Sequence, residues 1–422
     1  MKTLVLIGDG MADFPLAELD HRTPLEAAET PAMDAVVQRG RIGQFCPIPD
    51  DLPAGSDIGN LSLFGYDPHA TFTGRAPLEA ARQGIQLTPR DVAFRCNLVT
   101  LEDGIMANFT SGHISTEEAA QLIVAVQEAC ADLPTHFHSG VSYRHLTIIA
   151  PDNGVVQDLV DTACTPPHNI SDRPIAPHLP DGPGRDLLLQ IMERSQDVLR
   201  NHPVNQARIA QGQVPATSVW LWGQGLAPSM QTYQERFGIS GAVISAVDLV
   251  KGIGTCAGLE VIDVPGATGY LDTNYEGKVA AALEALDRHD FVYLHVEAPD
   301  ETAHEGRTDL KIQAIEDFDR RVVAPCMDKA IERDDCRVLV APDHITAIST
   351  KTHAGGPVPF ALFGPGVVPD AAQAYAESVA QASGITIHKG WTLTNHIIQA
   401  AQIDGASLSE LDTVYQGAHT TP

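Results

Sequence analysis

Short apolar runs alternate with amphipathic segments toward both ends of this chain. The runs, rich in Val, Leu and Ile, lie at residues 3–8, 218–223, 241–245, 291–296, 337–341 and 360–363. Runs of this kind are typical of buried parallel strands. Apolar residues recur at helical spacing in 276–286 and 308–321. Strands that alternate with helices predict an α/β fold with a mostly parallel sheet and helices on both faces.

The middle of the chain has a different pattern. Residues 91–101 and 143–150 are predicted strands, and residues 115–130 form a predicted helix that opens with the capping-box sequence STEE. Residues 152–184 are dense in Pro, Asp and Asn, which predicts a loop. We therefore expect an inserted α+β domain at 78–215 within a core formed by 1–77 and 216–422.

Composition narrows the class of protein. The chain has 422 residues and a net charge of -27, which argues against a nucleic-acid partner but not against a small phosphorylated metabolite. Without an apolar run of membrane length, no membrane partner is expected. The first ten residues reach an acidic residue too soon for a signal peptide. Seven scattered cysteines without a CxxC motif indicate reduced thiols, so we expect a cytoplasmic protein of undetermined oligomeric state.

Three acidic residues follow apolar runs. They are Asp9, Asp300 and Asp343, and the accompanying histidines are His304, His344 and His353. The carboxyl ends of strands in an open α/β sheet meet at one edge, where ligands bind. Asp300 and His304 are four residues apart and would share a helical face, whereas Asp343 and His344 at a turn could bind two different ions. Mixed carboxylate and imidazole ligands predict two divalent metals, with Mn, Zn or Co favoured over Mg.

Ser56 stands between Gly55 and an apolar helical stretch. A serine at a helix N-terminus lies in a positive field that favours an alkoxide and an incoming phosphate, and a metal contact would lower its pKa. Taken alone, the pattern favours an ordinary N-cap serine. The nucleophile is therefore the less favoured interpretation of the residues by themselves.

Nine motifs then give the chain a family resemblance. In order, they are GDGMAD, RTPLEAAETPAMD, LPAGSDIGNLSLFGYDP, FTGRAPLEA, NHPVNQARIAQG, PGATGYLDTNYEGK, HVEAPDETAH, APDH and HAGGPVP. They run through nearly the whole chain. The chain resembles the archaeal-type cofactor-independent phosphoglycerate mutases, a glycolytic family within the alkaline phosphatase superfamily of binuclear metalloenzymes.

The resemblance implies roles for named residues. It implies that Ser56 is the nucleophile and becomes phosphoserine. It further implies that one metal is bound by Asp9, Ser56, Asp343 and His344, and the other by Asp300, His304 and His353. The expected activity is isomerisation of 3-phosphoglycerate to 2-phosphoglycerate through phosphoryl transfer.

The substrate half departs from the family pattern. The segment 106–116 lacks the family's Asp-Arg pair, Trp222 stands where an Arg is expected, and Pro166 replaces an Asp before His168. A bacterial branch with similar WLWGQG sequence has been proposed to contain homoserine kinases. Basic residues that remain candidates for substrate binding, together with that histidine, are Arg75, Arg95, Arg144, Arg208, Lys278 and His168.

Three alternative functions therefore stay open beside the mutase. Transfer from ATP to homoserine would make the protein a kinase, and transfer to water would make it a metal-dependent phosphatase. An inactive metal-binding interaction protein is the third alternative. The presence of Ser56 together with all six Asp and His ligand candidates argues against this last one.

Overall fold

The computed structural model describes residues 1–151 and 156–414. The chain forms two compact units, Met1–Phe72 with Ser229–Pro422, and Thr73–Pro228. The second unit thus begins earlier and ends later than the predicted insertion at 78–215. The reason is that α5 (Arg75–Arg82) packs against β3 (Val92–Glu102) and β7 (Ser218–Gly225).

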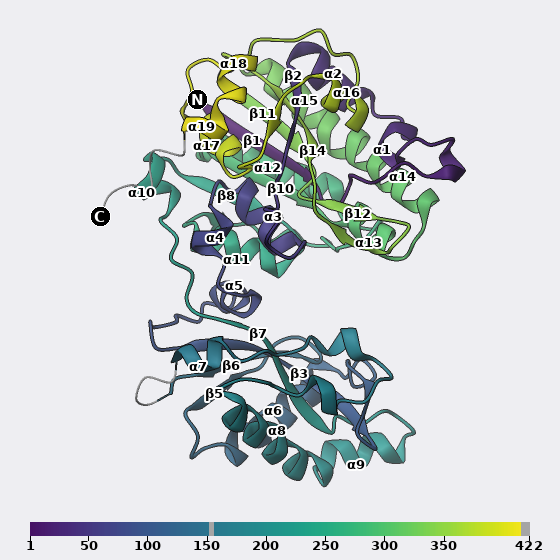
Figure 1. Cartoon of the computed structure of the whole chain (residues 1–422), viewed down its shortest axis with the longest axis vertical. Helices are drawn as coiled ribbons and strands as arrows, with labels where there is room; N and C mark the ends of the chain where they lie inside the picture. The colour runs from purple at the N-terminus through teal and green to yellow at the C-terminus, as the bar shows by residue number, and fades with distance from the viewer. Residues whose placement is uncertain (152–155, 415–422) are drawn as a thin grey trace. The chain divides into compact units, whose positions relative to one another are not determined.

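The first unit is built on an eight-stranded sheet of order β15-β2-β14-β11-β1-β10-β8-β9 (Figure 1). Its strands are β1 (Lys2–Gly8), β2 (Arg41–Phe45), β8 (Gly241–Ile244), β9 (Glu260–Val261), β10 (Phe291–Val296), β11 (Cys336–Ala341), β14 (Val358–Phe363) and β15 (Thr386–Ile387). Only β14 runs antiparallel to its neighbours β11 and β2 among the described pairings of this sheet. The prediction of a mostly parallel sheet is confirmed.

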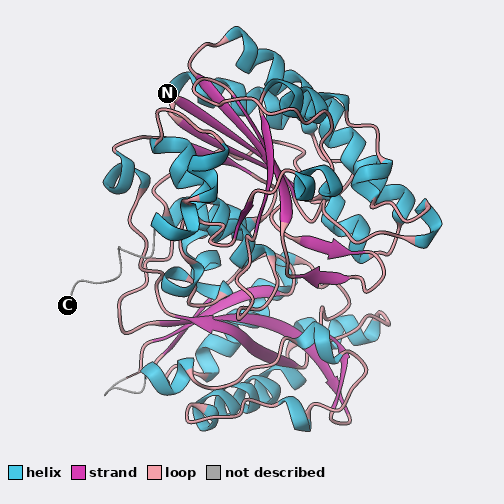
Figure 2. Cartoon of the chain, turned by 45° about the horizontal axis from the view of Figure 1, so that its top comes forward, coloured by secondary structure: helices cyan, strands magenta, loops and turns pink. Residues whose placement is uncertain are grey.

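Helices cover both faces of this sheet, because its central strands are apolar on both sides. The face that includes Leu4 and Leu6 packs on α2 (Pro31–Arg39), α12 (Tyr275–Arg288), α14 (Thr308–Phe318) and α15 (Ala324–Glu332). The opposite side contacts α3 (Ser56–Leu63), α11 (Asp248–Cys256) and α17 (Thr392–Gln399), where Tyr293 of β10 stacks on Phe64. Figure 2 shows the strands in magenta with cyan helices on either side.

Shorter elements connect these layers. The helical ones are η1 (Ala17–Leu19), α1 (Pro24–Ala27), α4 (Pro68–Thr71), α10 (Tyr233–Phe237), α13 (Ala298–His304), the π-helical turn η4 (Asp319–Val323), α16 (Glu377–Ala382), α18 (Gly405–Ser409) and α19 (Leu411–Val414). A separate hairpin pairs β12 (Ile345–Ala347) with β13 (Thr352–Ala354) and places Thr346 opposite His353. This hairpin follows β11 directly, and it returns the chain to the carboxyl edge of the sheet.

The second unit contains a five-stranded antiparallel sheet. Besides β3 and β7 it comprises β4 (Ile105–Asn108), β5 (Thr135–His138) and β6 (Arg144–Ile149), and its helices are α5, α6 (Thr116–Ala129), α7 (Val156–Val160), η2 (Pro167–Ile170), η3 (Ala176–His178), α8 (Arg185–Arg200) and α9 (Pro203–Ala210). Ser115 and Glu118 form the predicted capping box.

Two predictions for this region need correction. The apolar run 218–223 was expected in the core sheet, but β7 pairs with β3 instead, because an apolar run does not specify its partner strand. The predicted loop 152–184 contains α7, η2 and η3, while residues 152–155 of that prediction lie outside the described residues.

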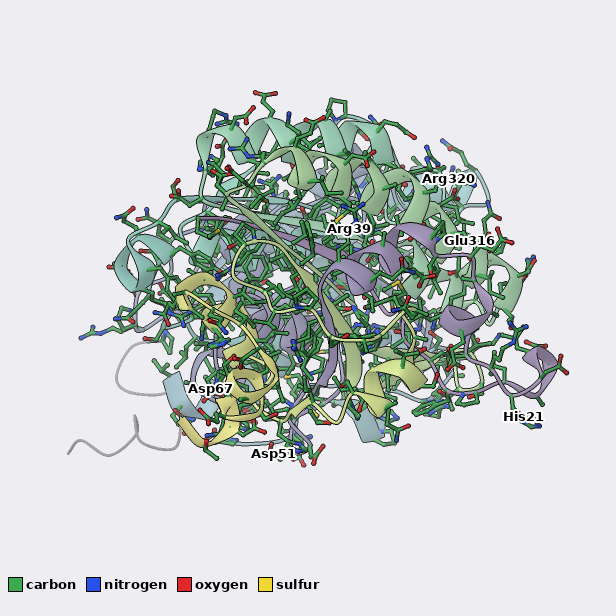
Figure 3. The ribbon with its side chains drawn as sticks, turned by 90° about the horizontal axis from the view of Figure 1, so that it is seen from above. His21, Arg39, Asp51, Asp67, Glu316 and Arg320 are labelled. Carbon is green, nitrogen blue, oxygen red and sulfur yellow. The ribbon has the colours of Figure 1, made fainter. Side chains whose placement is uncertain are left out.

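The exposed charged side chains and the free cysteines agree with what the composition predicted. Charged side chains such as Arg39, Arg320 and Asp51, labelled in Figure 3, lie on the exterior. All seven cysteines are free. Among the helices of the described residues, none combines the length and apolar character needed to cross a bilayer.

Candidate metal and nucleophile centre

Three neighbouring strands deliver the acidic residues to one edge of the sheet. Strand β1 lies between β10 and β11, Asp9 follows β1, and Asp343 lies just beyond β11. Asp300 comes from α13, which begins directly after β10. All three side chains are buried, with at most 5% of the residue exposed. The convergence predicted from parallel strand ends is present.

The first group of ligand atoms consists of Asp300, His304 and His353. His304 Nε2 lies 3.2 Å from Asp300 Oδ2 and 3.0 Å from His353 Nε2, and His353 Nε2 lies 3.5 Å from Asp300 Oδ1. Atoms about 2.1 Å from a tetrahedral ion lie about 3.4 Å apart, so this spacing suits one transition-metal ion. His304 reaches Asp300 across one helical turn, whereas His353 arrives through the β12–β13 hairpin.

The second group is centred on His344 Nε2. Around it lie Ser56 Oγ at 3.0 Å, Asp9 Oδ1 at 3.3 Å and Asp343 Oδ2 at 3.4 Å. The chain bends after β11, so the adjacent Asp343 and His344 converge here rather than point to separate places. This arrangement matches the spacing of a second cation's ligands.

Ser56 is the first residue of α3, and it is not the cap of that helix. The N-cap position belongs to Gly55, and no side-chain cap hydrogen bond is made there. The Ser56 hydroxyl instead contacts the imidazole of His344. The N-cap interpretation is therefore wrong, and the hydroxyl is placed among candidate ligands.

The electrostatics of the centre favour a cation. Burial raises the pKa of Asp9 well above its usual value, and Asp343, Asp300 and Glu297 raise it further. Asp9 Oδ1 has no hydrogen-bond partner among the described residues. Burial also acts to raise the pKa of Asp300, but hydrogen bonds from His304 and His353 outweigh it and lower that pKa. Buried carboxylates this close repel one another, and divalent cations would stabilise them as ligands.

Several supporting residues escaped the sequence analysis. His295 Nε2 lies 2.9 Å from Asp9 Oδ2. Two further sets of mutually close ligand atoms overlap the two groups, namely Asp9 with His295 and Asp343, and Asp9 with Asp300 and His344. Asn60 donates to Asp343 Oδ2 and to the Ser56 carbonyl oxygen, and it accepts a hydrogen bond from the Tyr293 hydroxyl. The sequence signal that could have revealed them is a polar residue within an apolar run, such as His295 in FVYLHV and Asn60 in the helix that begins at Ser56.

In the second unit, four of the predicted substrate-binding residues lie close to one another, and two of them contact Trp222. The Arg95 guanidinium lies 4.1 Å above the Trp222 ring, and the His168 ring meets the same indole edge-on at 5.3 Å. The charges of Arg95 and Arg75 both lower the pKa of His168, after the larger effect of burial. Arg144 lies close enough to affect Arg95. We call these four residues and Trp222 the arginine cluster.

Arg208 and Lys278 do not join the arginine cluster. The Arg208 guanidinium is buried and donates to Glu118 and to the carbonyl oxygens of Val214 and Ser111. Lys278 belongs to the first unit, where it is fully buried and donates to the His295 carbonyl oxygen. Burial lowers the pKa of Lys278 to about 8. The charged groups of Arg208 and Lys278 therefore both make hydrogen bonds within the fold.

Comparison with known proteins gives consistent matches. The family model described as 2,3-bisphosphoglycerate-independent phosphoglycerate mutase matches residues 37–205. A Geobacter sulfurreducens protein named "Probable 2,3-bisphosphoglycerate-independent phosphoglycerate mutase" is 52% identical over 93% of this chain and 98% of its own. A Methanosarcina barkeri protein named as the same mutase is 49% identical over 95% of this chain and 100% of its own.

Solved structures agree with the sequence matches. A Pyrococcus horikoshii protein superposes with a TM-score of 0.79 at 28% identity, covering 96% of this chain and 98% of that one. The cofactor-independent phosphoglycerate mutase of Thermoplasma acidophilum superposes with a TM-score of 0.65 at 26% identity, covering 95% and 100%. These likenesses extend over both units of the chain.

Proposed function

Because the chain belongs to the 2,3-bisphosphoglycerate-independent phosphoglycerate mutase family, we propose that it interconverts 3-phosphoglycerate and 2-phosphoglycerate through a phosphoserine at Ser56. The observation that carries the proposal is the position of the Ser56 hydroxyl, 3.0 Å from His344 Nε2 and among buried carboxylates. A serine held there is placed for nucleophilic attack rather than for helix capping.

Two divalent cations complete the proposed centre, with Mn first and Zn, Co or Mg as alternatives. One is held by Asp300, His304 and His353, and the other by Asp9, Ser56, Asp343 and His344. When bound, the cations supply positive charge to the phosphoryl oxygens and lower the pKa of the serine hydroxyl. Asp9 Oδ1, which has no hydrogen-bond partner among the described residues, and the distances of 3.0 to 3.5 Å between ligand atoms in each group support this assignment.

The chemistry is then a balanced exchange of phosphoryl groups. The Ser56 oxygen attacks phosphorus and loses its proton, while the bond from phosphorus to the C3 oxygen of glycerate breaks and that oxygen takes up a proton. The C2 hydroxyl of the retained glycerate next attacks the phosphoserine and gives up its proton. The serine oxygen is thereby released and protonated, so the cycle needs no second substrate.

We assign the arginine cluster of the second unit to the anionic groups of the substrate. Arg75, Arg95 and Arg144 bring guanidinium groups near one another, and planar guanidinium groups suit carboxylate and phosphate. His168 adds a further donor beside them. As a glycolytic reaction this would take place in the cytoplasm.

An activity panel on one metal-loaded preparation tests the function. The panel compares 3-phosphoglycerate, homoserine with ATP, and a generic phosphate monoester, each with added Mn. We expect turnover of 3-phosphoglycerate to exceed the other two reactions. Faster phosphorylation of homoserine would assign the protein to the kinases, and faster release of inorganic phosphate would assign it to the phosphatases.

Trapping the intermediate tests the nucleophile independently. Acid quench during turnover should leave phosphate on the peptide that contains Ser56. Ser62 lies on the same helix, and its hydroxyl donates to the Pro47 carbonyl oxygen, so Ser62→Ala is a matched control. Phosphate on another peptide, or none under turnover, would contradict the proposed mechanism.

A further inference from the structure

One threonine hydroxyl contacts a ligand from each of the two groups. Thr346 Oγ1 lies 2.6 Å from Asp300 Oδ1 and 3.0 Å from His344 Nδ1. Thr346 is fully buried, so bulk water does not replace either contact. We propose that Thr346 is a positioning residue that holds His344 in the tautomer with its proton on Nδ1 and thereby links the two groups. The inference rests on the proposed use of Asp300 and His344 as metal ligands.

The assignment follows from the number of protons available. A threonine hydroxyl has one proton to donate, and an ionised carboxylate can only accept. The hydrogen bond from Thr346 Oγ1 to Asp300 Oδ1, at 2.6 Å, uses that one proton. Thr346 Oγ1 therefore donates to Asp300, and it must accept from His344 Nδ1. An imidazole that carries its proton on Nδ1, 3.0 Å from Thr346 Oγ1, has the Nε2 lone pair free to bind a cation.

The Nε2 atom of His344 lies among the other ligand atoms of the second group. His344 Nε2 is the atom around which Ser56 Oγ, Asp9 Oδ1 and Asp343 Oδ2 converge. In the other tautomer a proton would occupy that position and remove His344 from the ligand set. A single hydroxyl thus determines whether the second group is complete, while it also orients Asp300 of the first group.

The backbone around Thr346 is fixed on both sides. Its N–H donates to the Ala12 carbonyl oxygen at 3.2 Å, and its carbonyl oxygen accepts from Lys311 Nζ at 2.7 Å. Lys311 is held in turn by Asp13 at 2.8 Å, with both side chains fully enclosed. Gly10 leaves the room for this contact, because a Cβ there would lie 2.4 Å from Thr346 Oγ1 and 2.6 Å from Asp300 Oδ1.

Cobalt binding to the full chain tests the proposal without relying on activity. The metal-stripped protein is titrated with Co²⁺, and the visible absorption bands report binding to each group. Thr346→Val keeps the shape but removes the hydroxyl, and it should weaken Co²⁺ binding in both groups by about 10- to 100-fold. Thr346→Ser should restore most of the affinity. Thr394→Val is a matched control, because Thr394 is equally buried but donates to the Leu63 carbonyl oxygen.

Nitrogen NMR of the metal-free protein tests the tautomer directly. With ¹⁵N-labelled histidine, and His344→Gln for assignment, the wild type should show a protonated Nδ1 and a bare Nε2 at His344. Thr346→Val should shift the ring toward the other tautomer. A proton on Nε2 in the wild type, or unchanged Co²⁺ affinity in Thr346→Val, would overturn the proposal even if that variant were less stable.

These outcomes separate the inference from the proposed function. If the wild type bound Co²⁺ with the expected tautomer but did not turn over 3-phosphoglycerate, the mutase function would fail and the role of Thr346 would stand. If turnover were normal while Thr346→Val bound Co²⁺ like the wild type, the role of Thr346 would fail and the function would stand.

Discussion

The candidate metal and nucleophile centre of the first unit is acidic, whereas the arginine cluster of the second unit is basic. The centre gathers acidic groups in the interior, where each of Asp9, Asp300 and Asp343 is at most 5% exposed. The arginine cluster gathers basic groups of mixed burial, with Arg144 exposed and the Arg95 side chain, 14% exposed, paired with Glu79. Burial thus distinguishes the two sites as much as charge does.

The difference in burial explains why the centre has more fixed hydrogen-bond donors around it than the arginine cluster has. Buried carboxylates are unstable without partners, so the centre is surrounded by fixed donors such as Gly10 N–H, Asn60 and Thr346. In the arginine cluster, Arg95 is held by an ion pair with Glu79 at 3.1 Å and by stacking on the Trp222 ring. We therefore expect substitutions in the centre to remove function and substitutions in the cluster to weaken it.

The largest effect should come from Ser56→Ala. Loss of the nucleophile is expected to lower turnover by on the order of 10⁴-fold or more, because the covalent intermediate can no longer form. Metal content, measured by elemental analysis, should fall much less than turnover. Turnover near that of the wild type would exclude Ser56 as nucleophile, and Ser62→Ala provides the reference for a structural effect.

His353→Ala should remove metal from one group while leaving the other occupied. His353 contributes to the group of Asp300 and His304, whereas Asp9, Ser56, Asp343 and His344 keep their contacts. Elemental analysis after dialysis should show the metal content of the variant at about half that of the wild type. Equal loss from both groups would contradict the division of the ligands. His136→Ala, an exposed histidine of the second unit, serves as control.

Arg95→Ala should affect substrate binding without affecting the metals. Loss of a charged hydrogen-bond donor is expected to raise KM for 3-phosphoglycerate by about 10- to 100-fold, with metal content unchanged. Steady-state kinetics on the metal-loaded protein measures this change. Arg194→Ala removes an arginine of the same unit that pairs with Asp132 outside the cluster, and it should leave KM unchanged. An unchanged KM in Arg95→Ala would remove the arginine cluster from the substrate site.

Lys278→Met should have the smallest effect on catalysis and a measurable effect on stability. Burial lowers the pKa of Lys278 from its usual 10.5 to about 8. Between these values the unfolded chain binds more protons than the folded one, so the free energy of unfolding rises with pH. Relative to Lys278→Met, the wild type should gain about 3 kcal/mol between pH 8 and 10.5.

Urea denaturation across this pH range measures the difference between wild type and Lys278→Met. The exposed Lys329 on α15 supplies a matched control, since Lys329→Met should show no such pH-dependent difference. A large rise in KM for Lys278→Met, with a flat stability difference, would instead return Lys278 to the substrate-binding residues.

The sequence by itself determined the class of fold and most of the centre. Apolar runs followed by Asp9 and Asp343 identified candidate ligands at strand ends, because parallel strands end at a common edge. The spacing of Asp300 and His304 fixed their shared face, because four residues make about one helical turn. These conclusions depend on local periodicity and spacing, which the sequence alone contains.

Only the tertiary structure decided the contacts that depend on distant partners. The run of β7 is as apolar as a core strand, yet it pairs with β3, because an apolar run can be buried in either sheet. Lys278 has the sequence position of a solvated residue in a first helical turn but is enclosed beneath His295. Thr346 acquires its role from Asp300 and Lys311, which lie 46 and 35 positions away. Hydrogen bonding across such separations arises only when the sheet edge and the hairpin are assembled together.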